Sequence, residues 1–220
     1  MMNYAIVPHW FAGYNAILEM VFFVGTLLVG IYALKVCRLS GQRQSRLFGI
    51  SFLLISAAYF VQSLLNFAAS YSMAEGCGMQ AMSIPHNLNI AGIYAYMLLF
   101  LAALVTLAYM TLKIKNAKAY LFFLAVITTM LFFSSNKLYF FYVISSILLV
   151  YVSFYYLKNY LKSRKTAALI VFIAFLFLLI GKIHFIFSIN HGLFYVTGHL
   201  LEFVAYALIL LNLITVIRRK

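Results

Sequence analysis

Acidic residues are nearly absent from this 220-residue chain, which contains no aspartate and only three glutamates against 16 lysines and arginines. Charged residues of either sign make up 9% of the sequence, while hydrophobic residues make up 66% and the mean hydropathy is +1.04. A soluble domain is about 45–50% apolar, so this composition excludes one. The cations lie between long apolar runs, which is typical of membrane topology and not of nucleic-acid binding. We therefore predict an integral membrane protein in contact with the lipid bilayer and without a nucleic-acid partner.

Cysteine and proline are scarce as well, with two residues of each. Cys37 and Cys77 lie in successive connections between apolar runs and hence on opposite sides of a bilayer, so they cannot form a disulfide within the chain. Pro8 and Pro85 lie outside the apolar runs. We therefore expect helices without proline kinks, unlike the broken helices of many transporters.

Seven apolar runs of roughly 17–25 residues predict membrane-spanning helices, because a hydrocarbon core of about 30 Å needs about 20 helical residues. The fourth run is the shortest. No removable signal peptide is expected, since residues 1–15 contain no lysine or arginine. The predicted fold is a single all-α, seven-helix transmembrane domain over residues 1–220 with no soluble domain. The predicted spans are Tyr14–Val36, Leu47–Tyr71, Leu88–Leu112, Ala119–Ser135, Leu138–Leu157, Ala167–Ile189 and Leu193–Ile217.

The basic residues predict the orientation of these helices. Of the 16 lysines and arginines, 14 follow the first, third, fifth and seventh apolar runs, and only Lys137 and Lys182 do not. By the positive-inside rule the N-terminus lies outside and the C-terminus in the cytoplasm, and we predict the plasma membrane as the location. The basic loops can contact anionic lipid headgroups and offer a surface for a cytoplasmic protein partner.

A weak internal similarity relates the two ends of the chain. A shift of 123 residues aligns the first and second apolar runs with the fifth and sixth, in the same direction. This spacing predicts a parallel repeat of three helices, one linking helix and three helices. The matched pairs include Tyr32 with Tyr155, Lys35 with Lys158 and Phe52 with Phe175.

Polar side chains gather in the predicted outer halves of the helices, and the inner halves contain only scattered ones. In the last run His199 and Glu202 are three residues apart and share one helix face. A charge at the bilayer centre costs about 2.5–3.5 kcal/mol on insertion scales, so such residues indicate a functional site. We predict that polar faces of five helices converge on a pocket on the outer side. The candidate ligand-binding residues are Glu19, Gln62, Asn66, Asn89, Lys182, His184, Tyr195, His199, Glu202 and Tyr206.

The sixth run contains both Lys182 and His184, which cannot face the same pocket. Two residues along a helix correspond to a rotation of about 200°, so the two side chains point in nearly opposite directions. A cation this far from the membrane surface needs a partner. We predict that Lys182 pairs with a glutamate, either Glu202 or Glu19.

A divalent metal ion is one hypothesis for the ligand. His199 and Glu202, joined by His184 from the neighbouring helix, would supply imidazole and carboxylate ligands of the kind that zinc, manganese, iron or copper prefer. Haem held between His184 and His199 is a second hypothesis. Retinal is not expected, because microbial rhodopsins carry a lysine midway along the last helix and Leu193–Ile217 contains none.

The leading functional hypothesis is a receptor-like or sensory membrane protein that binds a small ligand, a proton or a metal ion in this pocket. Glu202 and Glu19 would be the acidic anchors, and His199 and His184 proton-switchable donors or ligands. A small secondary transporter is the main rival, which the repeat favours and the apolar inner halves oppose. Two further hypotheses are an intramembrane metal-dependent enzyme, for which the sequence contains no His-Glu-x-x-His motif, and a purely structural bundle.

Overall fold

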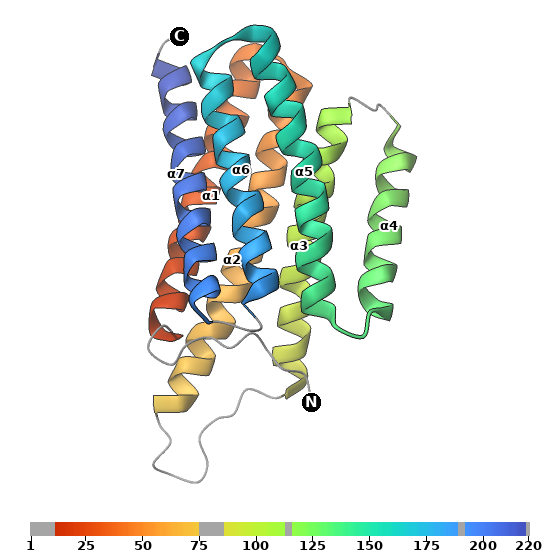
Figure 1. The fold of residues 1–220 in the computed structure, drawn as a ribbon, viewed down its shortest axis with the longest axis vertical. Coiled ribbons are helices and arrows are strands. Elements are labelled where there is room, and N and C mark those ends of the chain that lie inside the picture. The colour runs from red at the N-terminus through yellow and green to blue at the C-terminus, as the bar shows by residue number, and fades with distance from the viewer. Residues whose placement is uncertain (1–11, 75–85, 113–115, 189–191, 219–220) are drawn as a thin grey trace.

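The computed structural model of the chain describes residues 12–74, 86–112, 116–188 and 192–218, with side chains for 14–68, 90–112, 116–188 and 192–218. Within these residues it contains seven α-helices and no strand (Figure 1). The helices run roughly parallel to one long axis, as expected for a bundle built from apolar runs of similar length. They are α1 (Ala12–Ser40), α2 (Arg43–Ala74), α3 (His86–Leu112), α4 (Ala117–Phe133), α5 (Lys137–Ser163), α6 (Thr166–Phe187) and α7 (Gly192–Arg218).

Six of the seven helices are long and apolar enough to cross a membrane, which confirms the predicted class of protein for those six. The exception is α4, whose 17 residues extend roughly 25 Å at about 1.5 Å per residue, less than a hydrocarbon core of about 30 Å. Its crossing of the bilayer therefore stays a prediction. Helices α1, α2 and α5 extend beyond the predicted spans by up to six residues at an end, and α3 and α7 by one or two. Helix α6 begins one residue earlier and ends two residues earlier than predicted.

The six long helices form a closed ring around a common core. Each packs against two others in the order α1, α2, α3, α5, α6, α7, and α7 returns to α1. The fourth helix lies outside this ring, against α3 and α5 (Figure 1). Side chains directed into the ring from any of the six long helices can therefore meet, whereas those of α4 cannot.

Short turns with suitable residues connect the ring helices. Gly41 adopts a positive φ of 67° and its amide N–H donates to the Cys37 carbonyl at 2.8 Å, which ends α1 and allows α2 to begin two residues later. At the start of α5, the Asn136 side chain accepts a hydrogen bond from the Tyr139 amide at 3.2 Å. These caps satisfy backbone groups at the ends of the helices without long loops.

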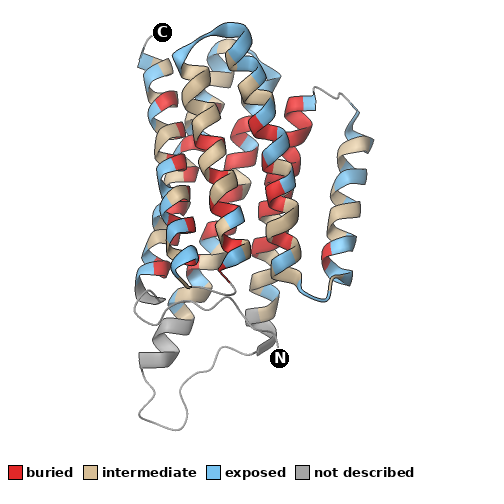
Figure 2. Ribbon diagram, viewed as in Figure 1, coloured by how far each residue is buried: buried red, intermediate tan, exposed pale blue. Residues whose placement is uncertain are grey.

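Burial separates the ring from α4 (Figure 2). Apolar residues of all six long helices are buried in one continuous core rich in aromatic side chains, including Phe52, Phe100 and Phe175. On α4 only Leu131 is buried, and Phe133 is 86% exposed. Large exposed apolar side chains also cover the outer surfaces of the ring helices, as expected for a surface that contacts lipid.

Candidate functional site

An ion pair lies in the middle of the six-helix ring. The Nζ atom of Lys182 on α6 is 2.6 Å from Oε1 of Glu202 on α7, and each side chain is 1% exposed. The predicted pairing of Lys182 with a glutamate is confirmed. A buried pair of this kind tolerates its loss of hydration only if the remaining polar atoms are also satisfied.

Tyrosine hydroxyls satisfy the second oxygen of Glu202. The Tyr59 hydroxyl of α2 donates to Oε2 of Glu202 at 2.9 Å and lies 3.0 Å from the Tyr206 hydroxyl of α7. Because the single hydrogen of Tyr59 goes to the carboxylate, Tyr206 is the donor in the second bond. The pair and the two tyrosines thus join α2, α6 and α7 through one chain of hydrogen bonds.

Two glycines bring Lys182 and Glu202 together. A Cβ atom on Gly181 would lie 3.1 Å from the carbonyl oxygen of Gly198, and one on Gly198 would lie 2.9 Å from the Phe185 ring. The backbones of α6 and α7 therefore approach as closely as glycine permits, as small residues allow in membrane helices. Lys182 follows Gly181 directly on α6, and Glu202 follows Gly198 by one turn on α7, so both side chains lie next to the point where the two glycines meet.

Aromatic rings surround the Lys182 ammonium on the sides that Glu202 leaves open. Its Nζ lies 4.1 Å from the centre of the Phe100 ring and 5.2 Å from that of Phe185. The rings of Phe141 and Tyr142 on α5 are centred 5.8 and 5.9 Å away. Ring faces attract a desolvated cation by about 2 kcal/mol or more. These four rings form an aromatic cage that stabilises the positive charge of Lys182 inside the bundle.

His199 lies beside the ion pair with aromatic neighbours. Its Nδ1 is 3.9 Å from Oε2 of Glu202, which is too long for a hydrogen bond but close enough for electrostatic attraction. Its ring contacts those of Tyr195, Phe185 and Phe22, with centroids 4.5, 4.9 and 5.9 Å away. The imidazole is therefore placed to respond to the charge on Glu202.

Glu19 forms a second acidic position on α1. It is 2% exposed, and its two oxygens accept hydrogen bonds from the Asn15 amide at 3.2 Å and from the Asn66 amide at 2.5 Å. The Asn15 side chain also interacts with Tyr195, whose ring contacts His199. Glu19 has no ion pair with a cation among the side chains that the structure describes, so its partners are neutral amides. This position and the ion pair are the two parts of what we call the buried polar cluster, made of Asn15, Glu19, Tyr59, Asn66, Lys182, Tyr195, His199, Glu202 and Tyr206.

Two predicted site residues form no hydrogen bond with the described members of the cluster, and the side chain of a third is outside the described residues. His184 is half-buried, its Nδ1 lies 2.8 Å from the Ile180 carbonyl, and its ring contacts Phe194, so it points away from Glu202 as its position two residues after Lys182 requires. The Gln62 Oε1 is buried and accepts no hydrogen bond from a described residue. Asn89 is outside the described side chains.

The predicted three-ligand metal set does not form. Among the described residues, no group of three or more histidine, cysteine or acidic side chains is placed to hold a metal ion. His199 and Glu202 are neighbours, but His184 is on the opposite side of α6 from Lys182. Because Lys182 faces Glu202, the rotation of about 200° between positions 182 and 184 directs His184 away from the site.

No protein-family model, curated protein or solved structure matches the chain. Its function therefore has to be inferred from the chemistry of the buried polar cluster and of the cavities around it.

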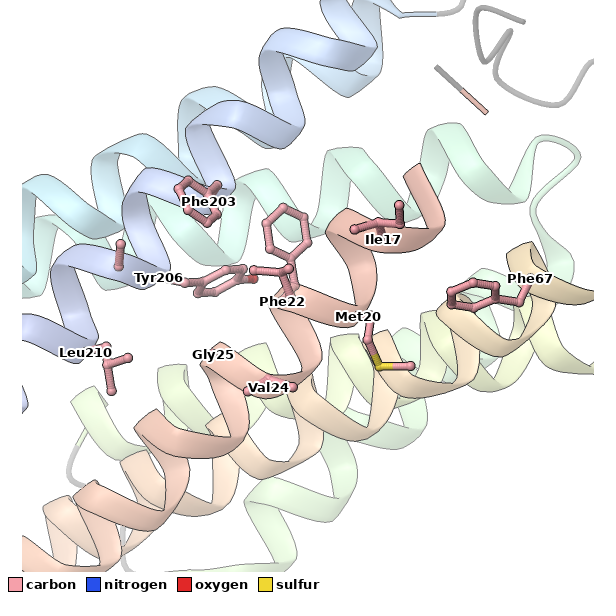
Figure 3. Close-up of a pocket in the computed structure, with 11 residues that line it drawn as sticks. Ile17, Met20, Phe22, Val24, Gly25, Phe67, Phe203, Tyr206 and Leu210 are labelled. Carbon is pink, nitrogen blue, oxygen red and sulfur yellow. The ribbon is translucent and has the colours of Figure 1, made fainter. Parts of the chain in front are cut away.

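The larger cavity is apolar. A groove of about 470 Å³ lies between α1, α2 and α7, and Phe22 and Tyr206 extend toward each other at its inner side (Figure 3). Of its eleven lining residues only Tyr206 carries a hydroxyl, and that hydroxyl is 3.0 Å from Tyr59. Neither this groove nor a second cavity at the end of the bundle near the C-terminus is lined by Glu19, Lys182, His199 or Glu202. These four side chains are buried among the described helices.

Several members of the site were missing from the sequence-based set. Tyr59 shares a face of α2 with Ser63 and Asn66, and Asn15 precedes Glu19 by one turn, so the helical spacing places both on the predicted polar faces. Neither was among the candidate ligand-binding residues. The cage ring of Phe100 gave no signal, because nothing in the sequence separates it from the many other phenylalanines of the core.

Proposed function

We propose that this protein is a receptor-like seven-helix membrane protein that binds a proton in the buried polar cluster and changes its helix packing in response. The observation that carries the proposal is the charge of the cluster, which holds two carboxyl groups, Glu19 and Glu202, and one lysine. With both carboxyls ionised the cluster has one negative charge without a partner, and a charge without a partner in a buried apolar setting is very unfavourable. One bound proton restores neutrality.

A proton is also the ligand that suits a packed site. Glu19, Lys182, His199 and Glu202 are buried and line neither cavity described above, and of the cluster only Tyr206 reaches the apolar groove, so a larger ligand would have to displace buried side chains. Glu19 is the proposed proton-binding group, because its hydrogen-bond partners are amides, whereas Glu202 already has Lys182. The titratable groups that interact electrostatically with Glu19 are Glu202 and Tyr195 of α7, Tyr96 of α3 and Tyr142 of α5, and Lys182 of α6 is paired with Glu202.

The proton-binding group connects helices that meet at few other polar contacts. An ionised Glu19 accepts hydrogen bonds within α1 and from α2, and a protonated one can donate a hydrogen bond as well. Protonation therefore changes the polar contacts within α1 and between α1 and α2. We propose that the N-terminus is outside and the C-terminus in the cytoplasm of a cell whose plasma membrane holds the protein, with the basic loops as the surface for a cytoplasmic partner.

We also propose that the chain contains a parallel repeat of α1–α3 and α5–α7. Support comes from the 123-residue spacing and from the arrangement of the helices, in which each group of three packs within itself and α4 lies outside the ring. In this arrangement Glu19 belongs to one repeat and the ion pair to the other. Proton binding would then act at the contact between the two halves.

The proposal predicts that the exchange behaviour of α1 and α2 depends on pH through Glu19. We expect backbone hydrogen–deuterium exchange of these helices, measured by mass spectrometry in nanodiscs, to differ between mildly acidic and mildly basic pH after correction for intrinsic rates. Glu19→Gln should remove most of this difference, because glutamine cannot take up the proton. The control His184→Gln removes a titratable group outside the cluster and should leave the difference in place. A difference that persists in Glu19→Gln and disappears in His184→Gln would contradict the proposal.

A proton-coupled transporter is the second candidate, and one observation favours it. The second cavity is lined by polar side chains, including Asn159 and Asn212, at the end of the bundle that we propose to be cytoplasmic. The sequence predicts only scattered polar residues in the inner halves of the helices, whereas these side chains line one common cavity. Proton flux into proteoliposomes, followed with an internal pH dye, separates the two candidates. Flux with the wild-type protein that stops in Glu202→Gln supports the transporter. No proton flux with the wild-type protein supports the receptor.

A further inference from the structure

A polar crevice occupies the end of the ring at which the α1–α2 and α5–α6 turns lie (Figure 1). It has a volume of about 220 Å³, and its apolar floor includes Phe48 and Ile209. Liquid water occupies about 30 Å³ per molecule, so the crevice has room for roughly seven waters or one small organic group. Its polar lining residues are Gln42, Gln44, Ser45, Tyr155, Tyr156, Asn159 and Asn212.

Asn212 is the deepest polar group of the crevice. Its side chain is 9% exposed and makes no hydrogen bond to any residue that the structure describes, although it lines the cavity. Buried polar side-chain atoms have a hydrogen-bond partner in the large majority of cases. The partner of Asn212 must therefore come from the contents of the crevice. The side chains of Gln42 and Asn159, nearer the mouth, likewise form no hydrogen bond within the described part of the chain.

The charges near the mouth are all positive. Arg43 lies between the lining residues Gln42 and Gln44 in the sequence and donates to the Tyr109 hydroxyl at 3.3 Å, and Lys158 directly precedes Asn159; neither cation lines the cavity itself. The two described glutamates belong to the buried polar cluster, and neither lines this cavity. A cleft with a rim of one sign attracts ligands of the other sign. The amides and hydroxyls inside the crevice are suited to hydroxyl groups, and the cations at the rim to an anion.

We propose that this crevice binds a polyol phosphate, with hydroxyl groups bonded to Asn212, Asn159 and Gln42 and the phosphate held among the cations of the rim. This chemistry occurs both in the phosphoglycerol headgroup of a bilayer lipid and in free glycerol 3-phosphate. The site is separate from the buried polar cluster, since they share no residue, and the inference does not rest on proton binding there.

Native mass spectrometry of the full-length protein tests the site with defined probes. We expect one tightly bound adduct with phosphatidylglycerol or with glycerol 3-phosphate, and weaker binding of phosphatidylcholine with the same acyl chains and of glycerol. Asn212→Leu should weaken that adduct by about 2- to 10-fold, the usual effect of losing one or two neutral hydrogen bonds. Thr215→Val is the control, because the Thr215 hydroxyl bonds to the Leu211 carbonyl of its own helix and the residue is exposed.

A second variant keeps the test valid if Asn212→Leu fails to fold. Asn159 is exposed near the end of α5, so Asn159→Leu leaves the packed core unchanged and should still weaken the adduct. Binding of the lipid alone identifies the headgroup as the source, and binding of glycerol 3-phosphate identifies the free compound. Equal affinity of wild type, Asn212→Leu and Asn159→Leu for both probes, or no preference for either probe over phosphatidylcholine and glycerol, would overturn the proposal.

Discussion

Replacing Lys182 with methionine is expected to lower the free energy of unfolding by about 3–5 kcal/mol, the usual effect of removing one partner of a buried ion pair. The Glu202 carboxylate would keep the Tyr59 hydrogen bond and lose the cation 2.6 Å away. Methionine is close to lysine in length and is apolar, so it can fill the space inside the ring of aromatic side chains. The measurement is reversible unfolding in mixed micelles, followed by far-ultraviolet circular dichroism.

The double variant Lys182→Met with Glu202→Gln should recover most of that loss. Removing both charges leaves neutral groups of similar size, and such replacements of buried pairs are often neutral or stabilising. Lys158→Met is the control, since Lys158 is exposed and its replacement should change stability by less than about 0.5 kcal/mol. If the losses of the two single variants simply add in the double variant, the two side chains do not interact.

Gly181→Leu is expected to be at least as damaging as the loss of Lys182. Its Cβ would lie 3.1 Å from the Gly198 carbonyl oxygen and 3.4 Å from Cγ of Glu202. The Gly198 carbonyl belongs to the backbone of α7 and cannot rotate away as a side chain could. The two helices must therefore separate, and the distance between Lys182 and Glu202 must increase. Overpacking a core costs about 1–3 kcal/mol, to which the cost of the disrupted pair is added.

Gly25→Leu is the matched control for this steric argument. A Cβ at Gly25 meets no atom within 4 Å, because the residue lines the apolar groove between α1 and α7 (Figure 3). Leucine is a better helix former than glycine, so stability should be unchanged or slightly higher. Equal unfolding free energies for the Gly181 and Gly25 variants would show that the α6–α7 crossing does not set the geometry of the site.

Periodicity and charge placement were sufficient to predict the helices and one important contact. Apolar runs located all seven helices, and six of them are long enough to cross a bilayer, whose thickness sets the length of a spanning helix. The Lys182–Glu202 pair was predictable because a lone cation in hydrocarbon needs an anion, and the chain has only three glutamates. The position of His184 outside the site also follows from its spacing relative to Lys182.

Other features depend on how the helices pack, which spacing along one helix does not determine. The place of α4 outside the ring follows from contacts between helices, and its apolar sequence resembles that of the others. The aromatic cage uses rings from α3, α5 and α6 that look like ordinary core residues. The crevice around Asn212 exists because side chains from several helices leave a gap at one end.

The central claim is that the buried polar cluster binds one proton at Glu19, and infrared spectroscopy tests it most directly. The chain has no aspartate and three glutamates, so in a Glu75→Gln background only Glu19 and Glu202 remain as side-chain carboxyls. We predict a pH-dependent C=O stretching band of a protonated carboxyl that persists when Lys182→Met and Glu202→Gln are combined and is lost in Glu19→Gln. An unchanged band in Glu19→Gln, or the absence of such a band in the Glu75→Gln background, would contradict the account.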